Sequence, residues 1–327
     1  MRLAILLALG AALFGSAMVA TVVGAVPLPL SAIVTAALHP ASTGAVSTIF
    51  WLLRLPRVLI GALVGASLAV SGTLMQGLLR NPLVDPYLTG ASAGAALAIA
   101  VAIALGVSPP AYSAIAFIAA LAVTLLVALL ARTGTGISPD RLIIAGVSLS
   151  ALFAGLTTLV ILLAQSSYVS LNILAWLGGS LVGHGWHDLM WASLYSCAGL
   201  ALGLAAVPAL NALRLGQRRA QSIGVDVERT RWLVVIATCL LTAAAVSVSG
   251  IIGFVGLIVP HIARAAIGHD LRWTLLAAMP IGATIVILAD MMARSAAPPL
   301  ELPLGILLST IGVPAFLYLA WRKVRIA

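Results

Sequence analysis

The sequence has 327 residues, of which 62% are hydrophobic and 8% are charged, with a mean hydropathy of +1.20. Because soluble domains carry about 25% charged residues, this composition excludes a soluble protein and indicates one polytopic membrane bundle. A net charge of +9 in a soluble protein would suggest nucleic acid as a partner. Here the cations flank apolar runs, where membrane orientation and anionic headgroups explain them. Cys197 and Cys239 lie far apart within apolar runs, and we interpret them as inert.

The chain begins like a signal peptide, with Arg2 ahead of an apolar run, but the run extends to Val23. Signal peptides have apolar cores of about 7–15 residues, so we predict a first membrane span instead. A spanning helix needs about 20 apolar residues. We predict ten transmembrane helices in an all-α polytopic membrane protein, at about 2–24, 56–79, 88–107, 111–131, 142–164, 190–210, 232–249, 251–267, 274–293 and 304–321. The continuous runs argue against membrane strands, which alternate.

The Lys and Arg residues fix the orientation of these spans. With the N-terminus inside, fourteen of the seventeen lie on the inner side, namely Arg2, Arg80, Arg132, Arg141, Arg214, Arg218, Arg219, Arg229, Arg231, Arg264, Arg272, Arg322, Lys323 and Arg325. Since inner loops carry the excess of cations, both termini are expected in the cytoplasm. Arg54, Arg57 and Arg294 are the outer-side exceptions and need a separate reason.

Two connections carry polar or aromatic residues. Residues 165–189, on the outer side, contain Trp176, Trp186, His184 and His187, and such aromatic residues favour the membrane interface. The two histidines could meet haem at an entrance, or they could be ordinary interfacial polar residues. The longest polar stretch, 211–231, is on the inner side, and within it we expect a short helix that a glycine ends.

Several function classes lack the residues that they need. The only lysine is Lys323, so the chain cannot hold the Gly-Lys-Ser/Thr of a nucleotide-binding P-loop, and HExxH and CxxC metal patterns are missing. Asp290 is the one acidic residue deep in a predicted span. It is a functional candidate for an ion-coupled secondary transporter, or else a hydrogen-bonded structural group. An intramembrane enzyme, a third class, would need a nucleophile or a metal set at membrane depth.

Three patterned blocks carry a resemblance to a known family. They are Arg54-Leu-Pro-Arg57 followed by Asn81-Pro-Leu-Val-Asp-Pro86, then Gly253-Phe-Val-Gly-Leu-Ile-Val-Pro-His-Ile-Ala-Arg264, then the run from Asp290 and Arg294 to Glu301-Leu-Pro-Leu-Gly305. With ten spans, the chain resembles the FecCD-like permeases of type II ABC importers for iron–siderophores, haem and vitamin B12. This implies a homodimer in the bacterial inner membrane, two ATPase subunits with ATP and Mg²⁺ on the cytoplasmic face, and a periplasmic binding protein outside.

The resemblance also implies what the chain does and does not do. It is expected to be one permease domain over 1–327 that catalyses no reaction and binds no cofactor, metal or nucleic acid itself. Arg54, Arg57 and Arg294 match arginines that pair with acidic residues of the binding protein. The alternative is that they cap helix ends or contact lipid headgroups.

The family's cytoplasmic gate maps onto two segments of this chain. Asn81 and Leu83 match one half, and Pro139 and Asp140 align with the other. At the second half the vitamin B12 permease has small hydroxyl residues, so this chain departs from it, which argues mildly against B12 as cargo. For Asn81, a role as a turn former ahead of Pro82 is an equal alternative.

The segment 211–231 matches the family's coupling helices, with an ordinary basic loop as the alternative. The residues implied to contact the ATPase are Arg218, Arg219, Ile223, Gly224, Val225 and Arg229. We expect the permease of an ATP-driven importer of an iron chelate, with haem slightly favoured over siderophore and vitamin B12 as the alternative.

Overall fold

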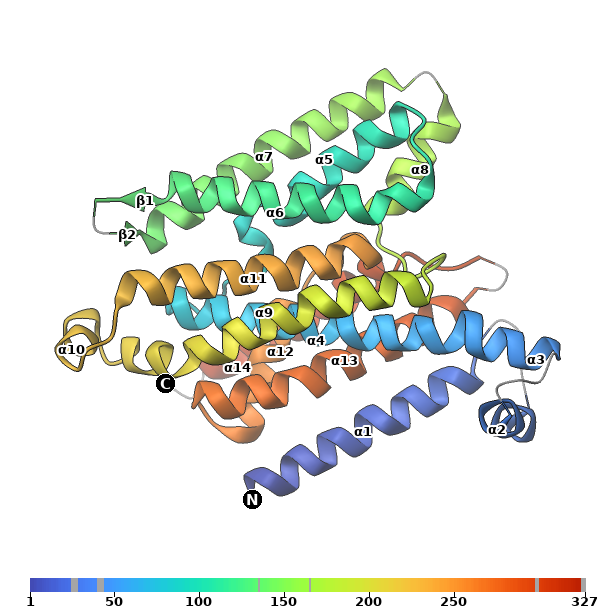
Figure 1. Cartoon of the computed structure of the whole chain (residues 1–327), viewed down its shortest axis with the longest axis horizontal. Coiled ribbons are helices and arrows are strands. Elements are labelled where there is room, and N and C mark those ends of the chain that lie inside the picture. The colour runs from blue at the N-terminus through green and yellow to red at the C-terminus, as the bar shows by residue number, and fades with distance from the viewer. Residues whose placement is uncertain (25–28, 40–43, 135, 165, 298–299, 325–327) are drawn as a thin grey trace.

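The computed structural model describes residues 1–24, 29–39, 44–134, 136–164, 166–297 and 300–324, so Arg325 lies outside the described residues. Regular structure in this part of the chain is almost entirely helical (Figure 1). The elements are α1 (Arg2–Val22), α2 (Leu30–Leu38), α3 (Ala45–Thr48), the π-helix η1 (Ile49–Arg54), α4 (Leu55–Leu79), the 3₁₀ helix η2 (Pro86–Thr89), α5 (Ala91–Ala104), the 3₁₀ helix η3 (Pro109–Ala111), α6 (Tyr112–Leu130), β1 (Arg132–Thr133), β2 (Gly136–Ile137), α7 (Pro139–Leu163), α8 (Ser167–Leu177), α9 (Trp186–Leu213), α10 (Gln217–Ser222), α11 (Val227–Ser249), α12 (Val255–Ile267), α13 (Leu271–Ser295) and α14 (Leu304–Val324).

Each of the ten predicted spans coincides with one of these helices, which confirms the all-α fold. Among the described residues, seven helical stretches are long and apolar enough to cross a membrane, and they include α1, α4, α6, α7, α9, α11 and α13. The other three predicted spans fall on α5, α12 and α14, where the apolar stretches are shorter, at 10–17 residues, and that of α14 is Leu304–Tyr318. A two-residue antiparallel hairpin, β1–β2, was not expected, and it lies in the connection between α6 and α7 rather than in a span.

The predicted span at 251–267 begins four residues late, at Val255. Gly250 ends α11 with a φ of 65°, and residues 251–253 follow without regular structure before Phe254, whose φ is 69°, precedes α12. A Cβ atom at Gly250 would lie 2.5 Å from the carbonyl oxygen of Trp176, so only glycine allows this approach. The backbone therefore leaves the helix here and packs against the segment after α8.

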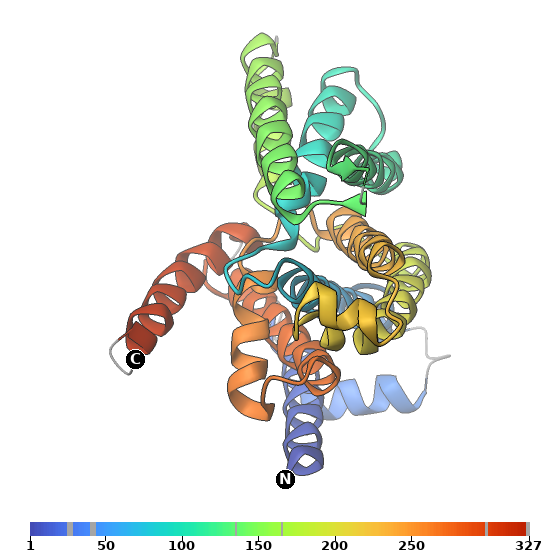
Figure 2. The same ribbon diagram turned by 90° about the vertical axis from the view of Figure 1, so that its left-hand side faces the viewer.

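Helix α4 lies at the centre of the bundle (Figures 1 and 2). Two of its glycines lie directly against the backbones of neighbouring helices. A Cβ atom at Gly65 would lie 2.2 Å from the carbonyl oxygen of Gly282 on α13, and one at Gly72 would lie 1.9 Å from that of Gly256 on α12. The backbones thus touch directly, as small-residue spacing in membrane helices predicts. By contrast, α7 and α14 project from the bundle in different directions (Figure 2).

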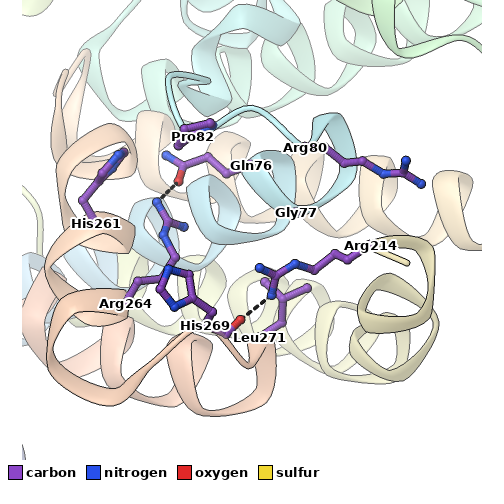
Figure 3. A pocket seen from close by; sticks show the side chains of 9 residues that line it. All are labelled: Gln76, Gly77, Arg80, Pro82, Arg214, His261, Arg264, His269 and Leu271. Carbon is purple, nitrogen blue, oxygen red and sulfur yellow. Dashed lines mark hydrogen bonds between the residues drawn. The ribbon is translucent and has the colours of Figure 1, made fainter. Parts of the chain in front are cut away.

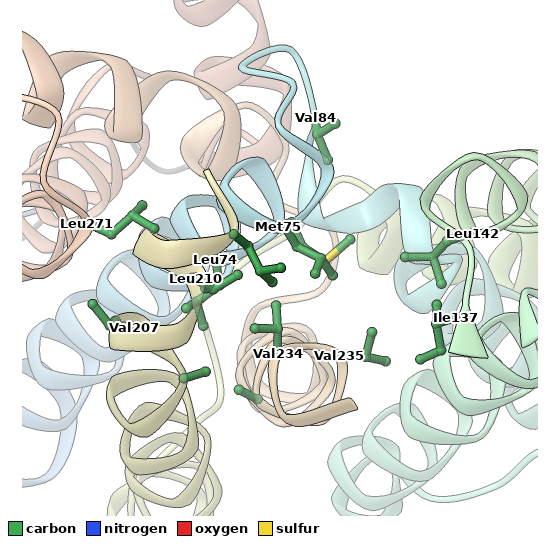
Figure 4. Packing of buried hydrophobic residues seen from close by; sticks show 14 of the residues in the cluster. Leu74, Met75, Val84, Ile137, Leu142, Val207, Leu210, Val234, Val235 and Leu271 are labelled. Carbon is green, nitrogen blue, oxygen red and sulfur yellow. The ribbon is translucent and has the colours of Figure 1, made fainter. Parts of the chain in front are cut away.

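Apolar packing fixes one end of the bundle. A cluster of buried residues joins α4, α9, α11 and α13 to β2 and α7 (Figure 4), with Leu74, Val207, Val234 and Leu271 among its members. Ala220 of α10 is part of the same cluster, so the short helix is anchored to the bundle. Following the predicted orientation, we call the end that carries α10 the inner end and the opposite one the outer end.

Candidate functional site

The outer end holds a network built around Arg57, at the start of α4. Its Nη2 lies 2.8 Å from Oδ1 of Asp290 on α13 and 2.7 Å from Oε2 of Glu301, which precedes α14. Its Nε also donates to both Asp290 oxygens, at 3.0 and 3.1 Å. Packing of α4 on α13 places Arg57 and Asp290 opposite each other although 233 residues separate them. Asp290 is therefore a hydrogen-bonded ion-pair partner near the outer end, one of the two roles left open by the sequence.

Arg54 and Arg294 donate hydrogen bonds to the end of α1. Arg54 donates to the carbonyl oxygens of Thr21 and Val22, both at 2.7 Å, and Arg294 donates to that of Ala20. The last carbonyls of a helix lack partners within it, and cations stabilise that end. Both side chains are buried, and Nε of Arg294 is 3.5 Å from Oδ2 of Asp290.

The structure thus brings the three outer arginines together, and we call them, with Asp290 and Glu301, the outer arginine cluster. Glu301 had no predicted role, although it lies in the Glu-Leu-Pro motif that carries part of the resemblance. Glu301 and Arg57 are the more accessible members, since their side chains are 36% and 15% exposed. Arg54 and Arg294 have residue exposures of 6% and 5%.

The residues of the predicted gate lie at the inner end. Asn81 Oδ1 accepts a hydrogen bond from the Leu83 backbone N–H at 2.9 Å, so Asn81 does form the turn after α4. Leu83 remains exposed. Pro139 begins α7 and lines a cavity that it shares with Arg80, and Asp140 is exposed in the first turn of the same helix.

The predicted coupling segment forms an anchored knob. The expected short helix is α10, and it ends just before Gly224, whose φ is 85°. Ala220 is buried beneath it, whereas Ile223 is 67% exposed and Val225 is partly buried. The exposed cations around this knob are Arg218, Arg219 and Arg229.

The two outer histidines are engaged within the chain. His184 Nδ1 lies 3.6 Å from Oδ2 of Asp188, and His187 accepts a hydrogen bond from Trp191 Nε1 at 3.0 Å. Burial lowers the pKa of His184, and Asp188 opposes this shift only in part. His187 and Trp191 also line a cavity of about 360 Å³ between α6, α9 and α11. In the described part of the chain, no group of three or more His, Cys, Asp or Glu residues could hold a metal ion.

Comparison with known proteins supports the resemblance over nearly the whole chain. The model of the FecCD transport family matches residues 11–322. The hemin transport system permease protein HmuU of Yersinia pestis is 38% identical over 280 residues, which cover 84% of this chain and 83% of HmuU. The cobalamin import system permease protein BtuC of Halobacterium salinarum is 39% identical over 318 residues, covering 94% and 83%.

A solved structure agrees with these relatives. It is an inward-facing conformation of a metal-chelate type ABC transporter, and it superimposes with a TM-score of 0.87 at 31% identity, covering 97% of this chain and 99% of the other. Relatives of this kind are transporter permeases whose ATPase is a separate chain, so the chain is not itself an enzyme. The chain belongs to the FecCD transport family and is a permease subunit of a type II ABC importer.

Proposed function

We propose that the chain forms the membrane path of an ATP-driven importer that moves an iron chelate from the periplasm to the cytoplasm, with haem slightly ahead of an iron–siderophore complex. The match of 97% of the chain to a metal-chelate type transporter carries this proposal. Haem is supported by a hemin permease among the relatives and by His184 and His187 on the outer side. Vitamin B12 is the alternative cargo, since a cobalamin permease is equally similar.

In the proposed assembly, two copies of the chain form a homodimer in the bacterial inner membrane with both termini in the cytoplasm. Each copy is one permease domain over 1–327, and two ATPase subunits that hold ATP and Mg²⁺ bind segment 211–231. The exposed Ile223 beside the buried Ala220 supports this, because a motor needs a projecting contact that is rigidly attached. The chain itself binds no cofactor in this proposal.

The outer arginine cluster is the proposed contact for a periplasmic binding protein. Arg57 is the member that acidic side chains of the binding protein reach. Its own side chain is partly exposed, and that of Glu301, with which it forms an ion pair, is more exposed. The charges of Arg54 and Arg294 add to the local field, which steers an acidic surface toward this end. Since Glu301 competes for Arg57, we expect Arg57→Glu to weaken docking and Glu301→Gln to strengthen it, with ATPase assembly unchanged in both.

The proposed cytoplasmic gate consists of Asn81 and Leu83 on one side and Pro139 and Asp140 on the other. The exposed Leu83 and the rigid turn made by Asn81 support this role, because a gate needs an apolar plug on a fixed backbone. The turn sits directly after α4, so movement of that helix would reposition it.

An ion-coupled secondary transporter is the alternative of another class. It needs a titratable group in the path, and Asp290 is instead held by Arg57 and lies near Arg294. The deciding experiment co-purifies the chain with its ATPase and measures ATP hydrolysis in proteoliposomes. Binding protein loaded with haem, a ferric siderophore or cobalamin is added in separate reactions. We expect stimulation by one iron chelate, whereas transport without a bound ATPase would contradict the proposal.

A further inference from the structure

Five basic side chains line one cavity at the inner end of the bundle. The cavity has a volume of about 320 Å³ and lies between the end of α4, the end of α9 and the turn from α12 to α13 (Figure 3). The described residues that line it include no carboxylate, and they are Gln76, Gly77, Arg80, Pro82, Arg214, His261, Arg264, His269 and Leu271. Such a concentration of cations in a hollow needs a source of negative charge.

Among the described residues, the three arginines donate hydrogen bonds only to neutral acceptors. Arg264 Nη2 donates to Gln76 Oε1 at 2.7 Å, and Arg214 Nη1 donates to the backbone carbonyl oxygen of His269 (Figure 3). Arg80 donates to the carbonyl oxygen of Leu213, and its side chain points away from Arg214 and Arg264 (Figure 3). None of these acceptors carries a charge that would offset the guanidinium groups.

Arg214 and Arg264 line the same cavity, so their like charges repel each other. The carboxylate of Asp270 follows His269 in the chain, but its oxygen accepts from Asn211 Nδ2 and from the backbone N–H of Arg272, both at 3.0 Å. It thus serves as the N-cap of α13. An anion between Arg214 and Arg264 would relieve their repulsion and use the donors that each guanidinium has in excess.

We propose that this cavity binds a phosphate group between the guanidinium groups of Arg214 and Arg264. Arginine is suited to this ligand because its planar fork matches two phosphate oxygens. The source is either the headgroup of an anionic phospholipid or free phosphate. In the proposed orientation the cavity faces the cytoplasmic leaflet, where basic pockets between membrane helices bind anionic headgroups.

A bound phosphate would connect the elements that transport is proposed to move. Arg264 donates to Gln76 near the end of α4, which leads into the turn that holds Asn81 and Leu83, and Arg214 lies between α9 and α10. Phosphate held by both arginines therefore ties the proposed gate to the proposed coupling segment. Binding itself requires neither transport nor a partner, so it is measured independently of the proposed function.

The test uses a pocket variant of the full chain that combines Arg214→Gln and Arg264→Gln. This variant and the unaltered chain are purified and placed in nanodiscs. The control variant combines Arg132→Gln and Arg141→Gln. It removes the same number of charges from exposed positions on the predicted inner side. One arm titrates inorganic phosphate in phosphatidylcholine discs. The other measures by native mass spectrometry how much phosphatidylglycerol each protein retains from mixed discs. Where a Gln variant does not fold, the corresponding Arg→Lys variant replaces it, and it should bind more weakly than the unaltered chain.

We expect at least about tenfold weaker binding for the pocket variant, since charged hydrogen bonds are lost, and little change for the control. Retention of phosphatidylglycerol without affinity for phosphate identifies a lipid site, and the reverse identifies a site for the free ion. Absence of both in the unaltered chain, or equal losses in the pocket and control variants, would overturn the proposal.

Discussion

Replacing Asp290 by Asn tests whether one buried carboxylate holds the outer arginine cluster together. Asp290 is 3% exposed, and its oxygens accept three hydrogen bonds from Arg57, at 2.8, 3.0 and 3.1 Å. Nε of Arg294 lies 3.5 Å away. Asn keeps the volume but removes the charge, so Glu301 would be the one carboxylate left in the outer arginine cluster.

The expected loss follows from what remains after the substitution. Removing one partner of a buried ion pair costs about 3–5 kcal/mol, because the other charge is left buried. Arg57 keeps two hydrogen bonds to Glu301, at 2.7 and 3.1 Å, so we expect the lower end of this range, about 3 kcal/mol. Glu301→Gln should cost less than about 1 kcal/mol, since more than a third of that side chain is exposed and hydrated.

The measurement is unfolding by SDS titration in mixed micelles, with a double-mutant cycle that combines Asp290→Asn and Arg57→Gln. Because the two residues are in direct contact, their coupling energy should exceed about 1.5 kcal/mol. A loss below about 0.5 kcal/mol for Asp290→Asn, typical of a surface position, would refute the reasoning. So would a coupling energy within error of zero.

Three further predictions concern other parts of the chain. Gly72→Val should lower the free energy of unfolding by more than about 2 kcal/mol or abolish folding, because the new Cβ would meet the Gly256 carbonyl. The control in the SDS unfolding assay is Gly155→Ala, since Gly155 has open space around it. Ile223→Asp should abolish co-purification of the ATPase while leaving the unfolding curve unchanged, since the side chain is exposed; retained ATPase would exclude this contact. His184 has a lowered folded-state pKa, so the unfolded chain binds more protons and stability should fall as pH drops from 7.5 to 5.5. His184→Gln should flatten this dependence, and a curve unchanged by it would contradict the assignment.

The helices could be predicted from sequence because each span depends on local composition. Runs of about 20 apolar residues have few alternatives to a helix in a bilayer, where every backbone polar group must be paired. The late start of α12 was missed because Ile251 lies against the distant Gly179 and Gly305, which no local pattern encodes. The outer arginines could be singled out because they lie on the predicted outer side, against the excess of cations on the inner side. Helix α10 could be predicted because a glycine follows it and ends it.

Contacts between distant residues were beyond such reasoning. The pairing of Arg57 with Asp290 needs α4 to lie on α13, and that packing is set by the approach of Gly65 to Gly282. The basic cavity was missed for the same reason, because its cations come from separate elements. In sequence they are ordinary members of a cationic inner face, and only the fold directs Arg214 and Arg264 into one hollow.

The outer arginines illustrate how one feature can have both a structural and a proposed functional reason. Their position opposes the orientation preference of the chain, but Arg54 and Arg294 satisfy carbonyls at the end of α1 that would otherwise lack partners. Helix capping, left open by the sequence, therefore accounts for these two without a binding partner. Arg57 contacts no part of α1 in this way, and its guanidinium is shared between a buried and an exposed carboxylate. The proposed docking thus depends chiefly on Arg57, and loss of Arg54 should loosen α1 before it affects a partner.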